Sequence, residues 1–209
     1  MKENLLALFE FLSVVPFYLI TFGLLNKIYK GKDGFNSKKY LLMTLIFAVY
    51  IFGVFYFTGV GTIFQINYYG GVNSQLAEFN LIPFSREIDT VAYVYNVLMF
   101  IPFGILVPFI WSKTNNFKTI LGYGFIFSLI IEISQLLNYR QTDIDDLLMN
   151  TLGAIIGFLL FKMISKIIKM RSNFSEQIKC EPMIYILTMF LSHFLLFNEF
   201  YLAKIIWGF

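Results

Sequence analysis

The sequence predicts an all-α integral membrane protein, a polytopic bundle of about six transmembrane helices. Of its 209 residues, 58% are hydrophobic and only 14% are charged, whereas roughly 25% of the residues in a soluble domain are charged. A helix that spans a bilayer needs about 20 mostly apolar residues. The segments that meet this requirement are residues 5–25, 41–60, 91–111, 120–137, 147–168 and 183–201. The last of them is the weakest, because Asn198 and Glu199 interrupt its end.

The basic residues indicate how these segments are oriented. The first, third and fifth loops, together with the end of the segment 147–168 that leads into the fifth loop, contain twelve of the sixteen Lys and Arg residues. Short cytoplasmic loops are enriched in Lys and Arg, so we predict that these loops face the cytoplasm and that both termini are extracytoplasmic. The remaining basic residues, Lys2, Arg86, Arg140 and Lys204, then lie on the outer side.

Polar residues recur near the outer ends of the predicted helices. Asn96, Glu132 and Asn150 each lie about six residues or fewer from the outer end of their segment, which corresponds to ~10 Å or less at ~1.5 Å per residue. Glu10 lies at a similar depth in the first segment. Polar groups in hydrocarbon are costly, so we interpret this layer as a candidate site.

The spacing of these residues indicates that two polar helix faces meet. Positions i, i+4 and i+7 share one face of a helix, and this spacing joins Ser128, Glu132 and Gln135. Asp143, Asp146 and Asn150 have the related spacing i, i+3 and i+7. Because the connection between the two helices is short, we expect them to be antiparallel neighbours whose polar faces converge.

The acidic turn before residue 147 allows more than one interpretation. Thr142 or Asp143 is a candidate helix N-cap, and the macrodipole favours acidic side chains at a helix N-terminus. Asp143, Asp145 and Asp146, with Asn150, are also oxygen ligands of the kind that bind a divalent cation. We favour a polar site that includes Arg140 over a metal site. A buried Glu132 carboxylate would need a partner to remain ionised, and Arg86 and Arg140 are the candidates.

Small residues and the single histidine have structural interpretations. Gly153 and Gly157 form a Gly-x-x-x-Gly pattern that allows close approach of another helix, and Gly104 leaves room for a neighbour. His193 lies in an apolar run, which favours a core or interface role over catalysis. The glutamate and aspartate positions alone leave open whether the polar layer binds a ligand or only fixes helix packing.

Four motifs in order resemble those of the VanZ-like family. They are Asn80 to Phe84 (Asn-Leu-Ile-Pro-Phe), Asn96 with Phe100 to Gly104, Glu132 with Gln135, and Thr142 to Asp146 followed by Asn150 to Gly153. The resemblance divides the chain into residues 1–79 with two helices, a VanZ-like core at 80–161, and residues 162–209 with a basic loop and the last helix. It implies a site formed by Asn80, Pro83, Arg86, Asn96, Glu132, Gln135, Arg140, Asp143, Asp145, Asp146 and Asn150, with no catalytic residue, metal or cofactor.

The resemblance also implies a function in the bacterial cell membrane. The family is named for a protein that lowers susceptibility to teicoplanin, a glycopeptide antibiotic with a fatty-acyl tail. The expected partners are membrane lipids and a lipid-linked cell-wall precursor or lipoglycopeptide, without nucleic acid and without an enzymatic reaction. Two alternatives remain: a membrane enzyme acting on an isoprenoid or phospholipid head group, and a small lipid transporter. Few basic residues on the outer side argue against a phosphate substrate, and the apolar inner halves of the helices argue against a transporter.

Overall fold

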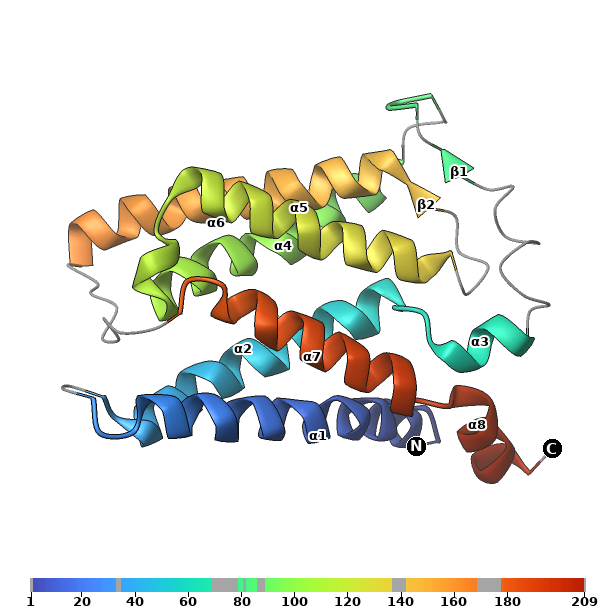
Figure 1. Ribbon diagram of the computed structural model, residues 1–209. Helices are drawn as coiled ribbons and strands as arrows, with labels where there is room; N and C mark the ends of the chain where they lie inside the picture. The colour runs from blue at the N-terminus through green and yellow to red at the C-terminus, as the bar shows by residue number, and fades with distance from the viewer. Residues whose placement is uncertain are drawn as a thin grey trace.

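The protein is a helical bundle in which six long segments run back and forth (Figure 1). The computed structural model describes residues 2–32, 35–68, 79–80, 82–85, 89–136, 142–168 and 178–208. In this part of the chain, five helices are long and apolar enough to cross a membrane, and a bent pair makes up to six. The predicted fold class is confirmed. The elements are α1 (Lys2–Tyr29), α2 (Ser37–Thr58), α3 (Ile63–Tyr68), β1 (Phe79–Asn80), α4 (Thr90–Ile110), η3 (Ser112–Thr114), α5 (Phe117–Gln135), β2 (Thr142–Asp143), α6 (Ile144–Ile168), α7 (Glu181–Leu196) and α8 (Glu199–Trp207).

The long helices form two layers (Figure 1). One layer contains α4, α5 and α6, and the other contains α1, α2 and α7. Aromatic side chains join the layers: the ring centroids of Phe55 in α2 and Phe127 in α5 are 6.2 Å apart, and those of Phe47 and Trp111 are 4.9 Å apart. Both termini, α3, α8 and the two short strands lie at one end of the bundle (Figure 1). The pattern of buried aromatic rings therefore fixes how the layers stack.

Small residues bring α4 and α6 into close contact. A Cβ atom added at Gly104 would lie 2.0 Å from the carbonyl oxygen of Ala154, and one added at Gly153 would lie 2.3 Å from that of Val97. At Gly157 the corresponding distance is 2.1 Å, to the carbonyl oxygen of Ile101. Only glycine permits this approach of two backbones, so the predicted packing role of these glycines is confirmed.

The sixth span differs from the prediction for residues 183–201. The helix ends at Leu196, and α8 follows after a bend of 51°. The side chain of Asn198 accepts a hydrogen bond from Tyr201 N, 3.0 Å away, and so starts a new helix. Gln65 in α3 donates to the Glu199 carboxylate across 2.6 Å. Asn198 and Glu199 interrupt the predicted last segment. Asn198 is the cap of α8, and Glu199 links α8 to α3.

A buried carboxylate joins α1, α2 and α7 at the end of the bundle away from the strands. The Glu181 carboxylate at the start of α7 accepts hydrogen bonds from the hydroxyls of Tyr29 in α1 and Tyr40 in α2. The Tyr40 and Tyr185 hydroxyls are 2.9 Å apart. Sequence reasoning missed this cluster, because Tyr29 and Tyr40 are more than 140 residues from Glu181 in the chain.

Candidate functional site

A short parallel strand pair fixes the segment around Asn80 beside the start of α6. Phe79 pairs with Thr142 and Asn80 pairs with Asp143. The Asn80 side chain adds to this contact: its Nδ2 donates to both oxygens of Asp143, and its Oδ1 accepts from Ile82 N and Ser85 Oγ. The side-chain amide of Asn80 thus connects β2, through Asp143, with the turn at residues 82–85.

Residues at the start of α6 also hold the turn at residues 82–85, which follows Asn80. Asp143 caps the helix, since its Oδ1 accepts from Asp145 N at 3.0 Å. Asp145 accepts from the backbone N–H of Phe84 at 2.9 Å and from the Tyr93 hydroxyl. Phe84 has a φ of 55°, a strained backbone value for a residue with a Cβ. Two of the predicted aspartates therefore stabilise the fold of the Asn80–Ser85 turn, and Pro83 lies exposed within it.

The close packing of α4 on α6 positions a second group of polar side chains. Asn96 Nδ2 in α4 donates to Asp146 Oδ1 in α6 across 2.6 Å. One turn further along α6, Asn150 Nδ2 donates to Ser128 Oγ in α5 at 2.9 Å. Three helices are joined in this way by amide donors.

The end of α5 contributes the remaining polar groups. Glu132 is 4% exposed, and its Oε2 accepts from the backbone N–H of Asp143 at 3.3 Å. Gln135 Nε2 donates to the carbonyl oxygen of Thr58 at the end of α2, 2.8 Å away. The amide oxygens of Gln135 and Asn150 are buried and accept no hydrogen bond from the described residues.

These side chains line a pocket of about 870 Å³ between α2, α4, α5 and α6. Five of the predicted residues contribute its polar part: Asn96, Glu132, Gln135, Asp146 and Asn150. Its apolar part comes from side chains of α2, α4 and α5: Tyr50, Val54, Phe57, Leu98, Met99 and Ile131, with Tyr95, Gly53 and Thr58 completing the described lining. The pocket thus combines polar groups with apolar walls.

The other predicted residues lie outside this lining. Asn80, Asp143 and Asp145 form the adjoining turn contact described above. Arg86 and Arg140, the candidate partners of Glu132, lie outside the described residues. The contribution of α2 was missed, because Tyr50, Val54 and Phe57 have the composition of an ordinary spanning helix. Thr58 contributes through its backbone carbonyl, which no side-chain pattern shows.

The acidic turn does not gather into a metal site in the described chain. No group of three His, Cys, Asp or Glu side chains there has the arrangement of metal ligands. Asp143, Asp145 and Asp146 instead make separate contacts with Asn80, Phe84 and Asn96.

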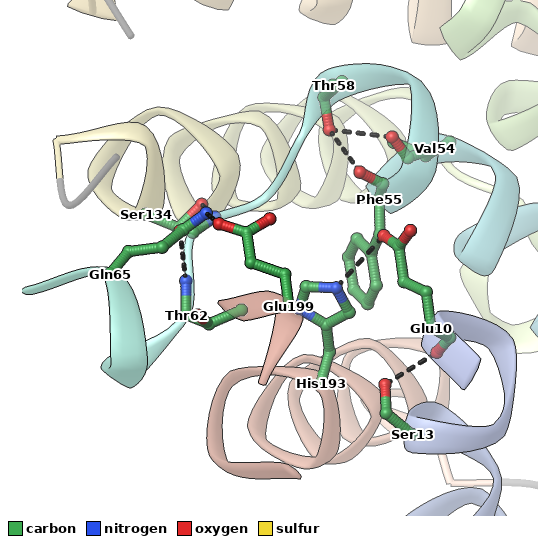
Figure 2. Close-up of polar contacts among 11 residues, drawn as sticks. Glu10, Ser13, Val54, Phe55, Thr58, Thr62, Gln65, Ser134, His193 and Glu199 are labelled. Carbon is green, nitrogen blue, oxygen red and sulfur yellow. Dashed lines mark hydrogen bonds and ion pairs between the residues drawn. The ribbon is translucent and has the colours of Figure 1, made fainter. Parts of the chain in front are cut away.

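Glu10 lies in a different polar cluster, between α1 and α7 (Figure 2). Its Oε1 is 3.2 Å from Nε2 of His193, which is 1% exposed. Phe55 packs against the imidazole ring with centroids 5.8 Å apart (Figure 2). His193 therefore lies at a helix interface, and Glu10 does not belong to the described lining of the pocket.

The fold and the pocket together define a multi-pass membrane protein with a polar pocket at one end of its bundle. A protein-family model described as VanZ/LLP1 matches residues 47–166. The chain therefore belongs to the VanZ/LLP1 family. The match begins within α2 and includes every described residue of the pocket lining.

A relative with a similar sequence supports the same family assignment. The chain is 32% identical to Protein VanZ of Enterococcus faecium over 103 residues. This alignment covers 49% of the present chain and 63% of that protein, so the chain spans less than two thirds of the relative's length. The search of solved structures gave no significant match.

Proposed function

We propose that this protein acts in the bacterial cell envelope and lowers susceptibility to teicoplanin by binding an amphiphile in the pocket, without a chemical reaction. The observation that supports this most strongly is the pocket itself, which combines buried polar groups with apolar walls. Glu132, Gln135 and Asn150 are each less than 9% exposed, although all three are polar. Polar residues inside a membrane mark functional sites by default, because their burial is costly.

The expected orientation places this pocket on the outer side. It lies where α2 and α5 end and where α4 and α6 begin. The basic residues of the described chain are concentrated at the other end, for example Lys27 near the end of α1 and Lys113 in η3. By the positive-inside rule that end is cytoplasmic, so the pocket would open toward the side that a glycopeptide reaches first.

The rim of the pocket suggests how an amphiphile enters. Phe57 in α2 is 75% exposed, and Tyr95 and Leu98 in α4 are also exposed, yet all three line the pocket. Deeper in the membrane, the Tyr50 hydroxyl donates to the Met99 carbonyl oxygen at 3.0 Å and joins the same two helices. An acyl chain in the outer leaflet would therefore enter between α2 and α4 above this contact, with its polar end directed at α5 and α6.

A susceptibility comparison tests this proposal. Wild type, Glu132→Gln and Asp146→Asn are expressed at matched membrane levels in a glycopeptide-sensitive Gram-positive host, and teicoplanin and vancomycin are titrated. Asp89→Asn is the matched control, because Asp89 caps α4 at the same end of the bundle outside the described pocket lining, and Asn caps a helix equally well.

We expect wild type and Asp89→Asn to protect selectively against teicoplanin, and both pocket variants to lose most of that protection. Equal protection against both antibiotics would argue against recognition of the acyl tail. If wild type gives no protection at good expression, the proposal fails, and lipid extracts should then be compared for a product of the alternative enzymatic function.

A further inference from the structure

Two amide side chains of the pocket wall have oxygens that accept no hydrogen bond from the described chain. Gln135 Nε2 donates to the Thr58 carbonyl oxygen, which can only accept, so the orientation of this amide is fixed. Asn96 is oriented in the same way, since its Nδ2 donates to Asp146. The amides of Gln135 and Asn96 thus both direct an N–H group at an acceptor within the protein.

Two of these oxygens are buried without a hydrogen bond from the described chain. They are Gln135 Oε1 and Asn150 Oδ1, on side chains that are 7% and 2% exposed and that both line the pocket. A buried acceptor without a donor is unfavourable, so such groups in a pocket mark places where a ligand can donate. The neighbouring carboxyl groups of Glu132 and Asp146 add further acceptor oxygens to the same lining.

We infer that the pocket selects an amphiphile with a neutral head group rich in O–H or N–H donors, such as a sugar or an amide, and discriminates against a phosphate. A phosphate would bring more acceptor oxygens to a wall that already presents them, and its charge would meet no basic side chain among the described residues of the lining. The described lining contains two acidic residues and no basic one. This inference rests on the proposed function, because it names the class of ligand for the same pocket.

The test compares two amphiphiles with the same chain, decyl glucoside and decyl phosphate, below their micelle concentrations. The full-length protein is held in phosphatidylcholine nanodiscs and carries a dye on Cys180, which is exposed at the start of α7, at the end of the bundle opposite to the pocket (Figure 1). Binding is measured as the change in thermophoresis of the dye. We expect decyl glucoside to bind at least about tenfold more tightly than decyl phosphate.

Two variants remove the buried acceptors one at a time. Asn150→Leu and Gln135→Leu should each weaken decyl glucoside binding by about 3- to 10-fold, the usual effect of one hydrogen bond. The matched control is Asn26→Leu, because Asn26 in α1 also has a buried amide oxygen without a partner in the described chain but does not belong to the described lining. If a pocket variant does not fold, Asn150→Asp should bind decyl glucoside nearly as wild type does, because it retains an acceptor oxygen and its carboxylate can accept from the Ser128 hydroxyl.

The possible results separate this inference from the proposed function. Stronger binding of decyl phosphate, binding of neither amphiphile, or equal effects of Asn150→Leu and Asn26→Leu would overturn the head-group inference. If protection against teicoplanin still depends on Glu132 and Asp146 in that case, the proposed function stands. If the glucoside binds as expected but no protection occurs, the proposed function fails and the binding specificity stands.

Discussion

Replacing Gly157 with alanine tests whether close packing of α4 on α6 holds the pocket end together. The new methyl carbon would lie 2.1 Å from the carbonyl oxygen of Ile101 and 3.0 Å from Cα of Gly104. A carbon–oxygen contact normally lies at about 3.3 Å or more, so the two helices must separate by roughly 1 Å. Such overpacking costs about 1–3 kcal/mol.

The control is Gly122→Ala in α5, where an added Cβ would have no neighbour within 4 Å. Both substitutions gain the same helix propensity of about 1 kcal/mol, so the difference between them isolates the clash. At about 2–4 °C per kcal/mol, Gly157→Ala should melt roughly 2–12 °C below Gly122→Ala. The assay is thermal unfolding in detergent, followed by size-exclusion chromatography. Equal melting temperatures for the two variants would refute the packing argument.

Two further predictions concern orientation and the turn at Asn80. In intact cells, a membrane-impermeant maleimide should label Thr90→Cys, which is exposed at the start of α4, in a Cys180→Ser background, and should leave the native Cys180 unlabelled until the cells are opened; the reverse pattern would invert the predicted topology. Asp145→Ala removes the acceptor of the Phe84 N–H, so amide hydrogen exchange there should accelerate about 10- to 100-fold, as expected for loss of a charged hydrogen bond. The control Asp89→Ala should leave exchange at Phe84 unchanged. If Asp145→Ala also leaves it unchanged, Asp145 does not hold this turn.

The sequence was sufficient to predict the layer of polar residues, because helical spacing and basic loops are local signals. Asn96, Glu132, Gln135, Asp146 and Asn150 all lie at the same end of the bundle, as their depth in the segments predicts. The bend after Leu196 was less clear, because a helix break depends on capping by Asn198 and on the contact with Gln65 from a distant segment. Local sequence signals therefore predict the depth of polar residues in the membrane well, and they predict helix breaks poorly.

Tertiary contacts account for what the sequence did not show. The carboxylate of Glu181 looks like an ordinary acidic residue at a helix N-terminus, and only the fold brings Tyr29 and Tyr40 to it. The contribution of α2 to the pocket could not be predicted from the sequence for another reason. Thr58 contributes a backbone carbonyl, and every residue has one, so the sequence cannot distinguish it. The division of the chain at residues 79 and 161 stays a prediction.

The neighbouring residues Asp145 and Asp146 show why a single acidic motif can serve two purposes. Consecutive side chains of an α-helix point about 100° apart, so two adjacent aspartates cannot face the same partner. Asp145 is directed at the turn, where it accepts from Phe84 and Tyr93. Asp146 is directed at Asn96 and lines the pocket. Asp145→Ala should therefore alter exchange at the turn, whereas the isosteric Asp146→Asn should reduce protection against teicoplanin and leave that exchange unchanged. If Asp146→Asn accelerated exchange at Phe84 as much as Asp145→Ala does, the turn and the pocket would be one cooperative unit rather than a support and a binding site.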